Sequence, residues 1–247
     1  MNKITNDKDL MFLYNCSNDN LKLLANAIIY DKDGKKRWSS KGVANEEFDK
    51  AYNNNDIKSL LPIIIDELQR YGGNSFLNIC RGHGVSYKEI LIKVCKQYNV
   101  NFNKDASAEL LERFLLQKIL LISAEKMTDE DVRHLGDINT RSKDLLLKNI
   151  TLFHLGDPLI IKMITTAVIQ IAQKNGLKML GGVVAKFAGG RAFALLTGPV
   201  GWGLASIWTL FDIAGPAYRV MIPATITIAY LRIISNKTDD ELNNIFN

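Results

Sequence analysis

The chain has 247 residues, of which 47% are hydrophobic and 23% are charged, and its formal net charge is +5. This composition is ordinary for a folded globular protein and excludes an intrinsically disordered chain. The first residues contain no apolar run of the signal-peptide type, and the three cysteines form no C-x-x-C pair. We therefore expect reduced cytosolic thiols and no disulfide framework.

Residues 1–156 predict a series of amphipathic helices. The clearest pattern lies in residues 106–122, where Leu111, Leu115 and Ile119 recur at helical spacing on one face. Glycine pairs such as Gly72-Gly73 end these helices. Sustained alternation of apolar and polar residues, which would indicate a sheet, is missing throughout. The sequence therefore predicts an all-α protein whose N-terminal body contains several helices.

The composition changes at Asp157-Pro158. Residues 157–236 are mostly Ile, Leu, Val, Ala, Gly and Thr, and breaks such as Gly198-Pro199 and Gly215-Pro216 divide them into about four helices. We interpret this part as an apolar, glycine-rich helical hairpin region. Residues 237–247 follow as a short polar tail. The expected organisation is therefore 1–156, 157–236 and 237–247.

Two interpretations of the apolar region remain open, a buried soluble hairpin and a hairpin that inserts into a membrane. The charge-free run from Ala192 to Phe211 is as long as the roughly twenty residues that cross a bilayer, but Gly198-Pro199 interrupts it. The shorter run from Val220 to Leu231 favours a buried helix. Small residues recur every four positions, a spacing that lets helices approach closely and permits oligomers. The glycines expected at this packing are Gly181, Gly182, Gly189, Gly190 and Gly198.

Positive charge is concentrated in the apolar part of the chain. Residues 1–150 contain 23 Lys and Arg against 21 Asp and Glu, whereas residues 151–232 contain 7 against 2. Cations on apolar segments favour an anionic membrane surface over nucleic acid, although helix capping would use the same residues. A protein partner is the other possibility. The candidate contacts, which include aromatic side chains suited to an interface, are Lys178, Lys186, Arg191, Trp202, Trp208, Tyr218 and Arg219.

Candidate chemistry is sparse. Arg81 and His83 alternate with glycines, so their backbone could form an anion-binding nest, although a plain turn between helices fits the same residues. The sequence has no nucleophile elbow, Walker A motif, dinucleotide fingerprint or zinc-ligand spacing. We therefore expect no catalytic residue, metal or cofactor. A hydrolase centred on His83 is the remaining enzymatic hypothesis.

Three blocks of the sequence together resemble the YaaW family of uncharacterised bacterial proteins. The first runs from Asp9 to Ser17, the second includes Gly72 to Gly84, and the third includes Tyr218 to Ala224. The resemblance covers nearly the whole chain. It implies a short N-terminal domain of unknown function and a helical body that is remotely similar to ubiquinol–cytochrome c chaperones, the assembly factors of a membrane respiratory complex. It implies no catalytic residue.

These observations lead to one main functional hypothesis and one alternative. The main hypothesis is a non-enzymatic binding or assembly factor, chaperone-like, that associates with the inner face of the bacterial membrane. The alternative is a pore-forming or membrane-disrupting toxin in which the apolar hairpin 180–232 inserts into a bilayer after a trigger.

Overall fold

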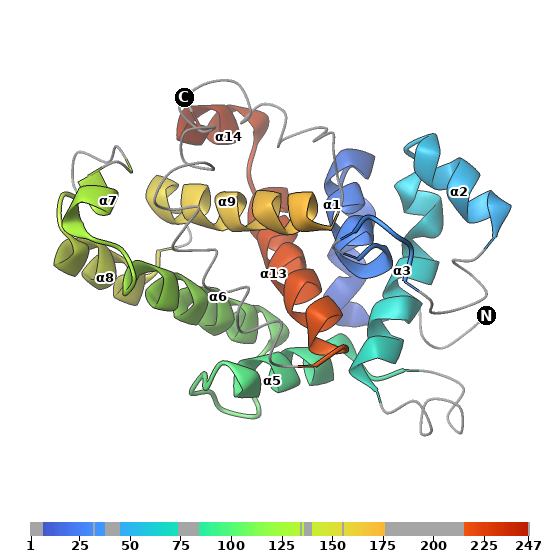
Figure 1. Ribbon diagram of the computed structural model, residues 1–247, viewed down its shortest axis with the longest axis horizontal. Coiled ribbons are helices and arrows are strands. Elements are labelled where there is room, and N and C mark those ends of the chain that lie inside the picture. Colours follow the sequence, from blue (N-terminus) through green and yellow to red (C-terminus); the bar gives the residue numbers. More distant parts are fainter. Residues whose placement is uncertain are drawn as a thin grey trace.

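The expected all-α fold is confirmed by the computed structural model (Figure 1), which describes residues 7–31, 33–37, 45–73, 84–133, 135, 140–154, 156–175 and 215–246. Within these ranges there are helices but no strand, and Tyr30 and Lys36 form an isolated antiparallel bridge. The helices before the apolar region are η2 (Lys8–Asn15), α1 (Asn18–Ile29), α2 (Glu46–Asn53), α3 (Ile57–Gly72), α5 (Tyr87–Gln97), α6 (Ala108–Ala124), α7 (Asp129–Arg133) and α8 (Lys143–Leu152). Those after it are α9 (Pro158–Lys174), α13 (Tyr218–Ser235) and α14 (Asp239–Phe246).

Local capping chemistry explains where many of these helices begin. Ser86, Ser107 and Ser142 each accept a hydrogen bond from the backbone N–H three residues later. Asp157 caps α9 in the same role, and Pro158 occupies the first helical position, where its missing N–H costs nothing. In α1 the capping side chain is Ser17, which accepts a hydrogen bond from the backbone N–H of Asn20.

Helix α13 lies at the centre of the fold. It packs against α1, α3, α5, α6 and α9, and every residue from Val220 to Leu231 is buried. Figure 1 shows it between α1 and α3 on one side and α6 on the other. A helix that is apolar on all sides suits this position, because each of its faces meets another helix. The expectation of a buried helix in this run is confirmed.

The described parts on either side of residue 156 share one hydrophobic cluster, which includes Leu24 of α1, Leu115 of α6, Ile164 of α9 and Ile228 of α13. The domain boundaries expected from the sequence stay a prediction. The C-terminal residues contain α14, whose Leu242 and Ile245 are buried and which packs against α9. This end of the chain is therefore part of the packed body.

Candidate functional site

A buried ion pair joins α6 to α13. The side chains of Glu112 and Arg232 are only 4% and 16% exposed. Nε of Arg232 donates to Oε2 of Glu112 at 2.7 Å, and Nη2 donates to Oε1 at 3.1 Å. Tyr87 of α5 donates its hydroxyl to the same Oε1 at 2.8 Å. The planar guanidinium thus meets the carboxylate along two bonds, the geometry that arginine provides and lysine does not.

Arg232 also reaches the N-terminal helix η2. Its Nη2 donates to the carbonyl oxygen of Asp9 at 2.6 Å, and the guanidinium lies 4.0 Å from the centre of the Phe12 ring. On its outer side, Nη1 is 3.8 Å from the exposed carboxylate of Glu109. One side chain therefore connects η2, α6 and α13, and it does so through charge-assisted bonds and a cation–π contact.

The electrostatics of this group follow from its burial. Burial raises the pKa of Glu112, and the hydrogen bonds from Arg232 and Tyr87 offset this only in part. Burial acts to lower the pKa of Arg232, but the bonds and charge of Glu112 outweigh it, so that pKa is raised. The pKa of Tyr87 is raised well above its usual value by burial and by Glu112. Tyr87 is therefore a hydrogen-bond donor at neutral pH.

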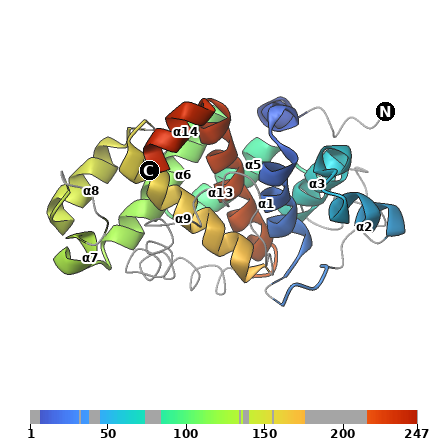
Figure 2. The same ribbon diagram turned by 90° about the horizontal axis from the view of Figure 1, so that it is seen from above.

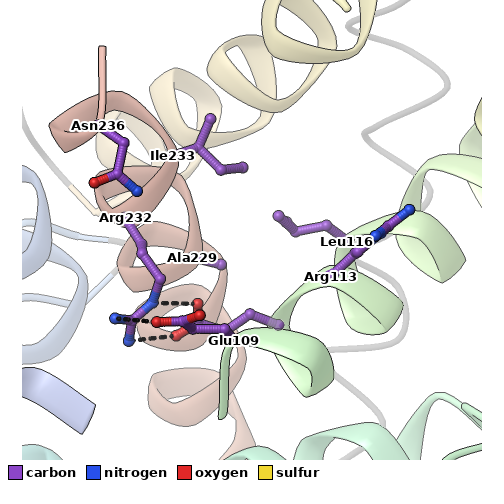
Figure 3. A pocket seen from close by; sticks show the side chains of 8 residues that line it. Glu109, Arg113, Leu116, Ala229, Arg232, Ile233 and Asn236 are labelled. Carbon is purple, nitrogen blue, oxygen red and sulfur yellow. Dashed lines mark hydrogen bonds and ion pairs between the residues drawn. The ribbon is translucent and has the colours of Figure 1, made fainter. Parts of the chain in front are cut away.

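A small pocket lies on the outer side of the ion pair, between α6 and α13 (Figure 3). Its volume is about 130 Å³, and its lining includes Glu109, Glu112, Arg113, Leu116, Arg232 and Ile233. Small-molecule sites usually enclose about 300–1,000 Å³, so this pocket is small for a substrate. The Glu112 oxygens and the Nε and Nη2 of Arg232 are already bonded within the protein. The arrangement is suited to holding four segments together.

A second buried polar cluster lies at the C-terminal end of α9. The side chain of Asn26 in α1 is buried, and its Nδ2 donates to the carbonyl oxygens of Ala172 at 3.2 Å and Asn175 at 2.8 Å. Its Oδ1 accepts a hydrogen bond from the Tyr52 hydroxyl at 3.2 Å. Asn26 therefore ties α1 and α2 to the residues at which α9 ends.

Arg37 extends this cluster toward the start of α13. Its Nε donates to the carbonyl of Tyr30 at 2.9 Å, and its Nη2 donates to Oδ1 of Asn175 at 3.4 Å. The pKa of Arg37 is lowered, first by burial and also by the nearby positive charge of Arg219, while Tyr71 and Asp31 act to raise it. Arg219 belongs to the first turn of α13. Figure 2 projects the end of α9 onto the start of α13, whereas Figure 1 shows the two at different levels. Arg37 is bonded to Asn175 and therefore lies where the chain leaves α9.

We call Arg37, Lys174 and Asn175 the root cluster, because they lie where the chain leaves α9. Of the contact residues expected from the sequence, Tyr218 is half-buried and packs against the core, and Arg219 is exposed. The other expected contact, packing and anion-binding residues lie outside the described residues; they are Lys178, Gly181, Gly182, Lys186, Gly189, Gly190, Arg191, Gly198, Trp202, Trp208, Arg81 and His83.

In the parts of the chain that the structure describes, no helix combines the length and apolar character that a bilayer crossing requires. The same ranges hold no group of three or more His, Cys, Asp and Glu side chains arranged to bind a metal ion.

Sequence reasoning missed Arg232, Glu112 and Arg37. A weak signal was available for the first two, because Arg232 directly ends the apolar run at Leu231 and Glu112 falls among the apolar positions of α6. A charged residue on the buried face of a helix needs a partner, but the sequence does not say which one. For Arg37 we find no local signal.

Two cysteine thiols are buried and should be unreactive in the native protein. Burial raises the pKa of Cys16 to about 11 and that of Cys95 to about 12. At pH 8 the thiolate of Cys16 is then about a thousandth of the total, and only the thiolate reacts with alkylating agents. In a Cys80→Ser background we expect no labelling by iodoacetamide in the native protein and two labelled thiols after unfolding, measured by intact mass. Rapid labelling of the native protein would contradict the described burial.

Comparison with known proteins decides the family. A UPF0174 protein of Helicobacter pylori strain J99 is 36% identical over 245 residues, which cover 95% of this chain and 94% of the relative. The UPF0174 protein YaaW of Escherichia coli strain K12 is 31% identical over 242 residues, covering 94% and 97%. The chain belongs to the UPF0174 family. The YaaW resemblance is thereby confirmed, and the likeness to ubiquinol–cytochrome c chaperones stays a prediction.

The N-terminal part of this UPF0174 protein also matches a family model described as a domain of unknown function, DUF3944, over residues 5–38. That match contains η2, α1 and Arg37, which supply contacts to both polar clusters. No solved structure matches the chain.

Proposed function

We propose that this UPF0174 protein is a non-enzymatic binding or assembly factor that associates with the cytoplasmic face of a bacterial membrane through its apolar stretch 176–214. One observation supports this most strongly. The apolar stretch directly follows Asn175, whose side chain accepts a hydrogen bond from the buried side of Arg37. The helical body therefore fixes the point at which the chain enters the stretch, as an anchored membrane-binding segment requires.

The composition of the stretch supports the same proposal. Residues 176–214 contain only four charged side chains, Lys178, Lys186, Arg191 and Asp212. An apolar segment with a cationic excess gains free energy at an anionic membrane surface from apolar burial and from electrostatic attraction. The body itself offers no catalytic arrangement at the pocket beside Arg232, which supports a binding role over an enzymatic one.

Flotation with lipid vesicles tests this proposal. We expect the full chain to float with vesicles that contain phosphatidylglycerol. A variant with Trp202→Asp and Trp208→Asp should remain unbound, because two carboxylates in the apolar stretch oppose insertion and repel the anionic surface. A control with Asn53→Asp and Gln97→Asp has the same net charge, with its substitutions at exposed positions of α2 and α5, and should float.

The outcomes separate the candidate functions. Failure of the full chain to float contradicts the proposal, and equal flotation of the Trp202→Asp/Trp208→Asp variant contradicts the role of the stretch. Release of a trapped dye from the same vesicles would favour the alternative of a pore-forming protein. A binding or assembly factor leaves the vesicles sealed.

A further inference from the structure

The pocket between α6 and α13 has the form of a short groove. Its lining comes from two helical stripes with the spacing i, i+3, i+4 and i+7, one from Glu109 to Leu116 on α6 and the other from Ala229 to Asn236 at the end of α13. A stripe of this spacing extends over two turns of a helix, or about 10 Å. An engineered cavity of about 150 Å³ holds one benzene molecule, so a groove of about 130 Å³ suits a short linear ligand with about five or six heavy atoms.

One part of this groove is apolar. Leu116 lines it from α6, and Ile233 lines it from α13 (Figure 3). Residue 229, one turn before Ile233 on α13, is alanine, whose small side chain leaves this space open. An alkyl group placed there would leave water, and each methylene that is buried would raise the affinity about fourfold.

The other part of the groove holds more carboxylates than the guanidinium beside them can bond. The carboxylates of Glu109 and Glu112 both lie next to Arg232. Glu112 takes the two short bonds, at 2.7 and 3.1 Å, whereas Glu109 lies 3.8 Å from Nη1, beyond hydrogen-bond distance. The side chain of Glu109 is 73% exposed, so its carboxylate can be reached from solvent. One negative charge at this end of the groove is therefore left without a cation at bonding distance.

Arg113, which also lines the groove, does not supply that cation. Its Nη2 donates to the carbonyl oxygen of Phe153 at 3.0 Å, and its guanidinium lies 6.0 Å from the centre of the Phe153 ring. Figure 3 shows the end of this side chain directed away from α13. An anion that entered the groove would thus meet two carboxylates beside an arginine that is already bonded, whereas a cation would be attracted to Glu109.

We propose that this groove binds a small aliphatic amine in its ammonium form. The ammonium group donates to the carboxylate of Glu109 from the solvent side, and the alkyl chain lies over Ala229 between Leu116 and Ile233. A ligand of this kind contacts both α6 and α13. The site is separate from the apolar stretch 176–214, so this proposal is independent of membrane association.

The ligand class is tested on the full chain with three probes, ethylammonium, butylammonium and butyrate. A ligand that binds only the folded chain raises its melting temperature, and the concentration dependence of that rise gives the apparent Kd. We expect butylammonium to bind about 15-fold more tightly than ethylammonium, because it buries two more methylenes. Butyrate should not bind. Butyrate that binds as tightly as butylammonium, equal binding of the two amines, or no binding of either amine would overturn the proposal.

Two variants with the same change in charge locate the site. Glu109→Gln removes the carboxylate at the groove, and Glu125→Gln removes one at the other end of α6; both residues are exposed, so neither change disturbs the core. We expect Glu109→Gln to weaken butylammonium binding about fivefold, the upper end of what an exposed ion pair contributes. Glu125→Gln should leave binding unchanged. An equal loss in both variants, or no loss in Glu109→Gln, would contradict the assignment of the ammonium to Glu109.

Discussion

Replacing Arg232 by methionine is expected to lower the free energy of unfolding by about 3–5 kcal/mol, the usual cost of removing one partner from a buried ion pair. The substitution leaves the carboxylate of Glu112 with the Tyr87 hydroxyl as its remaining described partner in this group. It also removes the bond to the Asp9 carbonyl and the contact with the Phe12 ring. Methionine keeps most of the side-chain volume, so a cavity contributes little. Denaturation by urea measures the change.

A second variant distinguishes an orphaned charge from a general packing defect. Arg232→Met combined with Glu112→Leu and Tyr87→Phe removes all three polar side chains, and apolar replacements for a buried ion pair are often neutral or stabilising. We expect this triple variant to recover most of the lost stability. A single Arg232→Met variant that costs less than about 1 kcal/mol would show that the ion pair is solvated in solution.

Replacing Asn26 by leucine should lower the free energy of unfolding by about 3 kcal/mol. The substitution leaves three buried groups without their partner, and a fully orphaned group costs about 1–3 kcal/mol. These groups are the Ala172 and Asn175 carbonyls and the Tyr52 hydroxyl. Leucine has the same number and branching of side-chain heavy atoms as asparagine, so most of the loss reports hydrogen bonding. Hydrogen exchange should also become faster in the last turn of α9, since Asn26 holds that turn to α1.

The control for Asn26 is Asn53→Leu, at an exposed position in the last turn of α2. A surface substitution of this kind changes stability by less than about 0.5 kcal/mol. If Asn26→Leu is equally mild, the buried cluster at the end of α9 does not hold this part of the fold together.

The helical architecture could be predicted because its causes are local. Helical spacing marked the segment containing α6, whose buried face includes Leu111, Leu115 and Ile119. The central position of α13 could be predicted only in part. A short apolar run predicts that the helix is buried, but it does not predict which helices surround it. The glycine-rich interior of the apolar stretch lies outside the described residues, so its expected packing is untested.

The polar clusters could not be predicted, because their partners are distant in the sequence. Arg232 and Glu112 are separated by 120 positions, and Arg37 and Asn175 by 138. Periodicity and capping signals extend over a few residues and carry no information about such pairs. The charge count did locate a basic excess in the apolar part, but it could not add Arg37, which belongs to the N-terminal half. That residue is placed at the root cluster by the folded chain alone.

The central claim, that the root of the apolar stretch faces a membrane, is tested most directly by depth-dependent fluorescence quenching. An environment-sensitive fluorophore is attached to a cysteine at position 173, exposed at the end of α9, and in a second protein at position 148 on α8. Cys80 is replaced by serine, and Cys16 and Cys95 are buried. With phosphatidylglycerol vesicles that carry nitroxide-labelled lipids, we predict strong quenching of the probe at 173 and none at 148. Equal quenching at both positions, or no quenching at 173, would contradict the account.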